Sequence, residues 1–221
     1  MDDKEIQVPE KSSGDIVHSV AKAGLSAIPV LGGTAVELFQ NVVQPPLEKR
    51  RAEWMAQVGE KLQELEDNGL ILEDLQNDEQ FISAAMYASQ LALRTHKEEK
   101  LEALRNAVAN IATGQAPDEA MQHIFLNLID NLTELHIQVL SVFQAPTTPP
   151  GLSMGGLSHV LEHNMPQMRG ERELCDQLWK DLYTRGLINT DSLHRTMSGN
   201  GLGQNRTTSL GAAFLRFISK P

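Results

Sequence analysis

Aromatic residues and cysteine are both scarce in this chain of 221 residues. Only 5% of the residues are Phe, Trp or Tyr, which leaves little material for a base-stacking surface or a large aromatic-lined pocket. The single cysteine, Cys175, excludes an internal disulfide and any zinc site built from two or four cysteines. A lone cysteine is typical of reducing compartments. Leu, Ile, Val, Ala and Met must therefore build the core.

We expect no secretory leader, and the sequence contains no long uninterrupted apolar run. Residues 1–5, MDDKE, are polar and acidic, whereas a signal peptide begins with a basic region followed by an apolar one. The most apolar segment, residues 16–43, is interrupted by Pro29 and Gly32-Gly33, and each half is shorter than the roughly 20 residues that cross a bilayer. Together with the single cysteine, these features predict a soluble, cytoplasmic protein.

Basic charge is in short supply over most of the chain. The formal net charge is −10, from 19 Lys and Arg against 29 Asp and Glu. Residues 1–149 carry 11 basic and 23 acidic side chains, whereas residues 150–221 carry 8 and 6. Because non-specific DNA affinity depends on Lys and Arg that neutralise phosphates, this balance disfavours DNA binding by the whole chain and restricts it to the last third.

Apolar residues recur at intervals of three or four positions, which predicts a mainly α fold of about eight helices. Thr95 and Glu98 have the spacing of a capping box. Thr133 is positioned to start a helix if the stretch 118–143 forms two helices rather than one. The predicted helices cover residues 16–27, 33–43, 47–67, 78–94, 96–113, 118–143, 157–164 and 171–186.

The composition divides the chain into three parts. Residues 1–14 are polar and are expected to form a disordered tail. Residues 15–132 are expected to form a helical bundle that includes an apolar hairpin over residues 16–43, which Pro45-Pro46 ends because proline has no N–H to donate. Residues 133–221 form the third part. The hairpin is predicted to pack against the long helices and to bury Leu25, Val36, Phe39 and Val43.

The third part resembles a winged helix-turn-helix module. Predicted helices at 133–143, 157–164 and 171–186 are followed by the short apolar pair Leu187-Ile188 and by a polar segment in which Gly199-Asn200-Gly201-Leu202-Gly203 suits a wing tip. The chain then returns through Thr207-Thr208-Ser209-Leu210-Gly211 into a last apolar helix. The resemblance implies a winged-helix-like C-terminal part with a small β wing, following a multi-helix N-terminal bundle.

The chain is also similar in outline to a group of small bacterial proteins. These join an Ile-Pro-x-x-Gly-Gly segment, here residues 28–33, to helices and a wing-like end. The group has no established activity, so this resemblance implies an all-helical fold and no particular chemistry.

The sharpest catalytic pattern is H-x-x-E-H, formed by His159, Glu162 and His163. On a helix the two histidines share one face and could ligate zinc, with the glutamate polarising a bound water. A zinc site needs at least three protein ligands, and no third ligand is recognisable. Cys175 lies beside Leu174 on a predicted helix and is expected to be a small buried side chain. The sequence therefore predicts no enzyme, no cofactor and no metal, with His159 and His163 as the nearest approach to a metal site.

We therefore expect a non-enzymatic bacterial interaction or regulatory protein that acts through its winged-helix-like surface, on a protein partner or on a second copy of itself. Arg and Asn side chains on a wing suit carboxylate or phosphate groups. A DNA-binding regulator is the first alternative, but the third helix of the module carries four acidic side chains against three basic ones. The candidate contact residues are Arg185, Arg195, Asn200, Arg206 and Arg216.

A membrane-acting effector that uses residues 16–43 is the second alternative, because helices rich in small residues pack closely in lipid. The cluster Lys49-Arg50-Arg51 follows this segment and could meet anionic lipid. The same cluster could instead pair with Glu48 and Glu53 on a solvated helix face, which is the usual arrangement of mixed charges on a helix. We favour the solvated face.

Overall fold

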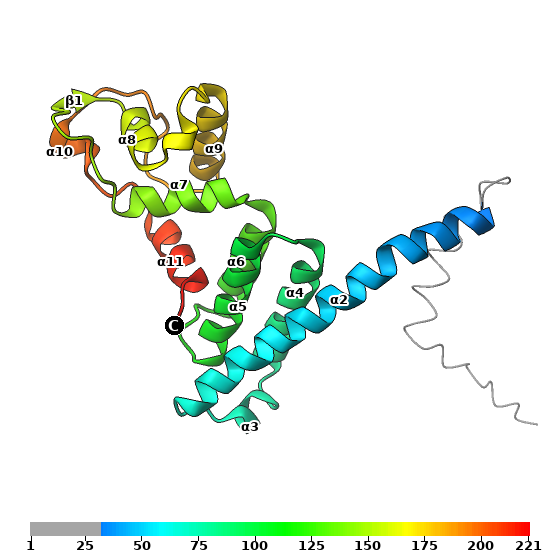
Figure 1. Ribbon diagram of the computed structural model, residues 1–221. Helices are drawn as coiled ribbons and strands as arrows, with labels where there is room; N and C mark the ends of the chain where they lie inside the picture. Colours follow the sequence, from blue (N-terminus) through cyan, green and yellow to red (C-terminus); the bar gives the residue numbers. More distant parts are fainter. Residues whose placement is uncertain (1–31) are drawn as a thin grey trace, which may run out of the picture. The chain divides into compact units, whose positions relative to one another are not determined.

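The computed structural model describes residues 32–221, with side chains from residue 36 onward (Figure 1). The described residues contain ten α-helices, one short 3₁₀ helix and one two-stranded antiparallel sheet. The prediction of a mainly α fold with a small β element is therefore confirmed. The predicted tail 1–14 and the first half of the predicted hairpin lie outside the described residues.

The first described element is one continuous helix, α2, which spans Gly32–Asp67 and contains Pro45 and Pro46 in its interior. The prediction that this proline pair ends a helix is wrong. Proline fixes φ near the helical value, so the backbone continues through both residues at the cost of two hydrogen bonds to carbonyl groups one turn earlier. Residues 41–50 are all exposed, and water can therefore hydrate the freed carbonyl groups.

The second half of the predicted hairpin is not buried. The sequence predicts Phe39 and Val43 in the core, but their exposed fractions are 59% and 39%. Val36 is half-buried, and Leu25 lies outside the described residues. Hydrophobic periodicity identifies the apolar face of a helix without identifying what covers it, and this explains the error.

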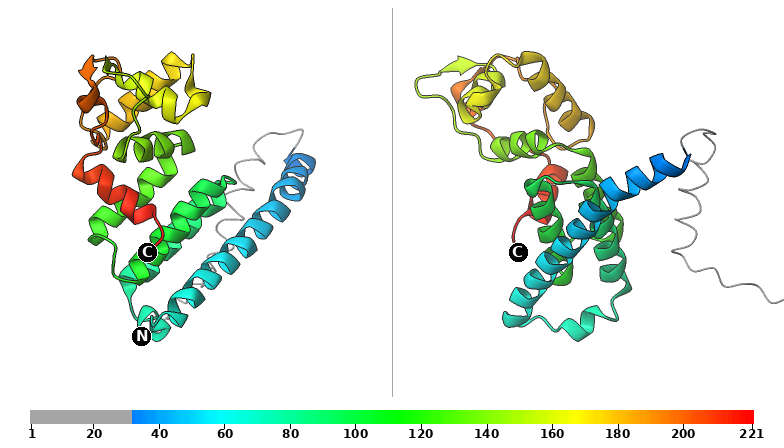
Figure 2. Two further views of the ribbon diagram at one scale, coloured as in Figure 1. Left: turned by 60° about the vertical axis from the view of Figure 1, so that its left-hand side comes forward. Right: turned by 45° about the vertical axis from the view of Figure 1, so that its right-hand side comes forward.

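Residues Trp54–Pro221 form one compact unit. Three helices pack against one another in it, and the last helix, α11, packs on the middle one, α5 (Figure 1, Figure 2). The unit therefore joins the predicted bundle to the predicted third part of the chain. The helices are α4 (Glu79–Arg94), α5 (Glu98–Ala112), α6 (Glu119–Asn131) and α11 (Ser209–Ile218), and the short helix α3 (Leu72–Leu75) precedes them.

Large aromatic side chains anchor the core of this unit. Trp54, in the C-terminal half of α2, is buried and donates from its indole N–H to Ser89 Oγ at 2.9 Å. The partly buried Val58, Leu62 and Leu65 follow Trp54 at spacings of four, four and three, so these side chains form the inner face of this helix. Phe125 of α6 packs against Phe214 and Phe217 of α11, with ring centroids 5.6 and 5.4 Å apart.

Two buried asparagines on α5 hold the end of α11. Asn110 Nδ2 donates to the carbonyl oxygens of Phe217 and Ser219, at 2.9 and 2.8 Å. Asn106 Nδ2 donates to the carbonyl oxygen of Ile218 at 3.0 Å. The last carbonyl groups of a helix have no partner within it, so these amides satisfy the carbonyl groups of the buried Phe217 and Ile218, which would otherwise lack a donor.

Capping decides where α4 and α5 begin. Asp78 accepts two backbone N–H groups of the first turn of α4, each at 3.0 Å. The capping box predicted for Thr95 and Glu98 does not form. Helix α5 begins at Glu98 with Lys97 at its N-cap, and Thr95 Oγ1 accepts the backbone N–H of Lys97 at 3.1 Å. The helix starts two residues later than predicted, so Glu98 lies too early in it to bond back to Thr95.

The stretch 118–143 divides at Thr133 into α6 and α7 (Glu134–Gln144), the second of the two predicted alternatives. His136 in the first turn of α7 is buried. Its Nδ1 accepts the backbone N–H of Thr133 at 3.1 Å, and its Nε2 lies 3.4 Å from Asp181 Oδ2 in α9 (Arg172–Thr184). Because a backbone N–H can only donate, Nδ1 carries no proton and the ring is neutral. Burial lowers the pKa of His136, although Asp181 acts in the opposite direction.

Low pH is expected to reduce the free energy of unfolding, because His136 is buried in its neutral form. The folded-state pKa lies below the unfolded value of about 6.5, so the unfolded chain binds the proton more tightly. Stability is therefore lost as the pH falls from near 6.5 through the folded pKa. Urea unfolding at about pH 7.5 and pH 5 measures this loss, and His136→Gln is expected to reduce it. His96→Gln, which changes an exposed ring, is the control. An undiminished loss in His136→Gln would contradict the assignment.

In the C-terminal part of the unit, α7 packs against both α8 (Leu157–Asn164) and α9. The structure gives α8 the bounds that the sequence predicts. A 3₁₀ helix, Pro166–Met168, separates α8 from α9. Trp179 of α9 is buried, meets Phe143 edge-on at a centroid distance of 4.7 Å, and donates its indole N–H to the Thr190 carbonyl at 2.9 Å.

The small sheet joins the segments before α8 and after α9. Strand β1 (Met154–Gly155) pairs antiparallel with β2 (Met197–Ser198), with Met154 opposite Ser198, and an isolated bridge joins Ile188 to Thr207. The glycine segment predicted as a wing tip is instead a helical turn, α10 (Gly199–Leu202). Ser198 Oγ accepts the Gly201 N–H at 3.3 Å, and this N-cap offsets the low helix propensity of glycine over a single turn.

Candidate functional site

The five predicted contact residues lie on different elements. Arg185 follows the last turn of α9, Arg195 precedes β2, Asn200 is in α10 and Arg216 is in α11, and all four are exposed. The half-buried Arg206 bonds to the residue that follows Asn200. Within the described residues, no hydrogen bond joins any two of the five. Partner binding at these positions stays a prediction.

Arg206 has a structural role in this part of the fold. Its Nη2 donates to the carbonyl oxygen of Gly201 and lies 3.2 Å from Met197 Sδ. Its Nε is buried and has no hydrogen-bond partner in the structure. Burial lowers the pKa of the Arg206 guanidinium. These contacts hold the segment 203–206 against α10, so the guanidinium is oriented inward.

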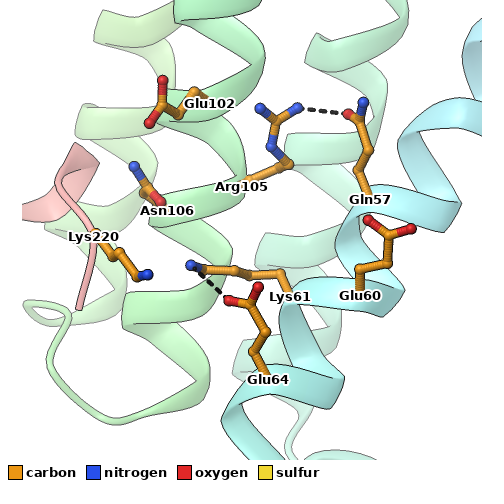
Figure 3. Close-up of a pocket in the computed structure, with 8 residues that line it drawn as sticks. All are labelled: Gln57, Glu60, Lys61, Glu64, Glu102, Arg105, Asn106 and Lys220. Atoms are coloured by element: carbon orange, nitrogen blue, oxygen red, sulfur yellow. Dashed lines mark hydrogen bonds and ion pairs between the residues drawn. The ribbon is translucent and has the colours of Figure 1, made fainter.

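A polar groove of about 360 Å³ lies between the C-terminal half of α2, α5 and Lys220 (Figure 3). Arg105 donates to Gln57 Oε1 and to Glu98 Oε1, each at 2.5 Å, and Lys61 pairs with Glu64 at 3.4 Å. The charges that line the groove balance, so its field favours neither anions nor cations. The charged lining consists of Glu60, Lys61, Glu64, Glu102, Arg105 and Lys220.

A smaller cavity of about 220 Å³ beside α8 and α9 includes Cys175 and His194. The Cys175 thiol is buried and points toward the Met168 carbonyl, and burial, with nearby acidic groups as smaller causes, raises its pKa. A thiol must lose its proton to act as a nucleophile. His194 Nε2 lies 2.7 Å from Asp176 Oδ1. Cys175 is therefore a packing residue, as the sequence predicts.

The H-x-x-E-H sequence lies on α8. His159 Nδ1 is 3.3 Å from the Gly156 carbonyl oxygen, and His163 is half-buried near the end of the helix. In the part of the chain that the structure describes, no three His, Cys, Asp or Glu side chains are grouped as metal ligands. The two histidines therefore have no third ligand among those residues.

No protein-family model, curated protein or solved structure matches this chain. Its own side chains are therefore the guide to its function. Among the described residues, exposed large apolar side chains are concentrated on α2.

Five large apolar side chains are exposed within ten residues of α2, with exposed fractions from 39% to 68%. They recur at the helical spacing of four, so they form a continuous apolar stripe along the helix. The sequence analysis assigns two of these residues, Phe39 and Val43, to the core. We call this surface the α2 stripe, and it consists of Leu38, Phe39, Val42, Val43 and Leu47.

Charged residues lie at the two ends of the α2 stripe. Glu37 precedes it, and Lys49 and Arg51 follow it. Lys49 lies 3.6 Å from Glu53 with both side chains exposed, which agrees with the solvated helix face favoured from the sequence. Among the described residues, no helix combines the length and the apolar character that a membrane span requires.

Proposed function

We propose that the chain is a non-enzymatic interaction protein and that the α2 stripe binds its partner. The observation that carries the proposal is the exposure of five large apolar side chains on one helix. Single exposed apolar residues are ordinary, but contiguous apolar surface on a soluble protein marks an interaction site. No charged residue occurs between Leu38 and Leu47, so a partner that covers the stripe does not bury a charge there.

The roles of the reactive side chains support a function without catalysis. The Cys175 thiol is packed and protonated, and His136 caps α7. A catalytic nucleophile or base needs an unoccupied lone pair directed at a substrate, and the Cys175 thiol and His136 Nδ1 already have partners within the fold.

A winged-helix-like surface over residues 133–221 is the second part of the proposal and gives the protein its regulatory contact. The order α7, β1, α8, α9, the bridge from Ile188 to Thr207, and α11 supports this arrangement, whereas α10 departs from the expected wing. Leu174 and Tyr183 are exposed on α9. Exposed apolar groups next to mixed charges suit a protein partner better than DNA, which selects for basic surfaces.

Site-specific photo-crosslinking in living cells tests the proposed function. A photoreactive residue at position 39 is expected to form discrete adducts with a partner, because Phe39 is a large exposed side chain of the stripe. Position 86 is the matched control, since Met86 is 61% exposed on α4 with no comparable apolar neighbours in its helix face. Phe39→Ala should change the free energy of unfolding by less than about 0.5 kcal/mol. Adducts at position 39 no more abundant than at position 86 would reject the proposal.

A further inference from the structure

We propose that His136 is a pH-sensitive switch at the junction between α6 and α7, which it holds in its neutral form and releases when the imidazole ring takes up a proton. The junction lies at Leu132 and Thr133, where the chain passes from the helices α4, α5 and α6 to α7, which packs on α8 and α9. This inference goes beyond the proposed function and does not depend on what binds the α2 stripe.

Both ring nitrogen atoms of His136 contact other residues. Nδ1 accepts the backbone N–H of Thr133 at 3.1 Å and lies 2.8 Å from Thr133 Oγ1, whereas Nε2 lies 3.4 Å from Asp181 Oδ2 in α9. In this neutral tautomer Nε2 carries the proton and Nδ1 has the lone pair that accepts. The neutral ring therefore ties the first turn of α7 to Thr133 and also faces α9.

Protonation changes the two contacts in opposite directions. An imidazolium donates from both nitrogen atoms, so Nδ1 can no longer accept the Thr133 N–H and directs its own proton at Thr133 Oγ1. Two N–H groups then face each other, and the Thr133 N–H turns to water, which the exposure of this residue permits. The Nε2 contact with Asp181 becomes an ion pair. The junction is thus released while α7 stays on α9.

The surroundings of the ring determine the pH at which the switch operates. Burial is the main reason that the pKa of His136 lies below its ordinary value. Arg185, which follows α9, and Lys100 of α5 add to the effect of burial, and Asp181 opposes it. Among the described residues, no charged group on α8 or α11, the other helices that pack on α7, acts on the ring. Because Asp181 favours the charged ring, its removal should shift the switch to lower pH.

NMR of the full chain tests the switch by comparing the titration of the His136 ring with hydrogen exchange of single backbone amides. Below the midpoint of the ring titration, the protection of the Thr133 amide should be about fivefold lower than above it, the equivalent of one lost N-cap interaction. The Gly211 amide is the control within the same molecule, because it donates to the Thr208 hydroxyl at 3.0 Å and this cap does not titrate.

Three results of this comparison would overturn the proposal. The first is a His136 ring that does not titrate before the chain unfolds. The second is a Thr133 amide whose protection does not change across the ring titration. The third is an equal loss of protection at Thr133 and Gly211, which would mean that acid weakens the whole unit and not the junction.

Two substitutions separate the switch from other effects of acid. His136→Gln cannot titrate and keeps an acceptor at the third position of α7, where glutamine is a common capping-box residue, so the pH dependence at Thr133 should disappear. Asp181→Asn should move the change at Thr133 to lower pH. Asp176→Asn removes another carboxylate of α9, paired with the exposed His194, and should leave the change where it is. A pH dependence that persists in His136→Gln, or equal behaviour of the two aspartate variants, would reject the proposal.

Discussion

Gly211→Ala is expected to destabilise the fold by more than about 3 kcal/mol. A Cβ at Gly211 would overlap the carbonyl oxygen of Leu187 and approach the Leu187 carbonyl carbon to 3.1 Å. The neighbouring backbone cannot move aside easily, because the Leu187 carbonyl accepts the N–H of Thr208 at 3.0 Å and the Gly186 carbonyl accepts the Thr208 hydroxyl at 2.6 Å. Alanine therefore forces α11 away from the segment that it packs on.

Urea unfolding followed by circular dichroism measures this effect. Gly59→Ala is the matched control, because no atom lies within 4 Å of a Cβ built at Gly59 in α2. That substitution should stabilise the chain by about 0.5–1 kcal/mol, the usual gain when alanine replaces glycine within a helix. A Gly211→Ala variant as stable as wild type would show that α11 can shift relative to Leu187 at little cost.

Asn110→Asp is expected to destabilise the protein by a similar amount, about 3 kcal/mol or more. The substitution conserves side-chain shape, so it leaves no cavity and isolates the role of the amide donor. A buried acceptor that loses its donor costs about 1–3 kcal/mol, and Asn110 serves the carbonyl groups of both Phe217 and Ser219. The new carboxylate would also face the negative end of a helix dipole.

The control is Asn131→Asp, because Asn131 is exposed and donates to the Asn127 carbonyl at 2.7 Å. Water can replace that donor, so the loss there should stay below about 1 kcal/mol. Chemical denaturation at neutral pH compares the two variants. Equal losses in the two would mean that burial of the acceptors does not determine the effect.

Local signals in the sequence predict much of the helical framework. The bounds of α8 follow from the short apolar period and its flanking breaks, and Thr133 starts α7 because a threonine before an amphipathic run is a capping signal. The inner face of the C-terminal half of α2, with Trp54 as its largest side chain, follows from spacings of four and three. These features depend on residues a few positions apart.

Features that depend on distant partners could not be predicted. Asn106 and Asn110 interrupt the apolar face of α5, and only the position of α11 gives those amides their acceptors. The pairing of β1 with β2 joins two dipeptides about 43 residues apart, too short to leave a strand pattern. The proline pair of α2 is the opposite case. Two adjacent prolines are a strong local signal for the end of a helix, yet α2 continues through them.

The candidate site was only half predictable. The sequence identifies Phe39 and Val43 of the α2 stripe as residues of an apolar face, but the period of such a face is the same whether it meets the core, another chain or water. Arg206, which the sequence predicts as a contact residue, instead makes an inward hydrogen bond to Gly201. That bond depends on the short helix α10, which the sequence does not predict because its two glycines disfavour a helix.

Because α11 packs on α5, a newly made chain cannot complete the core of the bundle until its last helix has been synthesised. Helices α4, α5 and α6 are neighbours in sequence and can associate as they leave the ribosome, whereas Asn106 and its acceptor at Ile218 are 112 residues apart. Contacts of such long sequence separation form slowly. Until α11 emerges, Phe125 lacks the two rings that cover it, and the nascent three-helix intermediate presents an apolar face of the kind that chaperones protect.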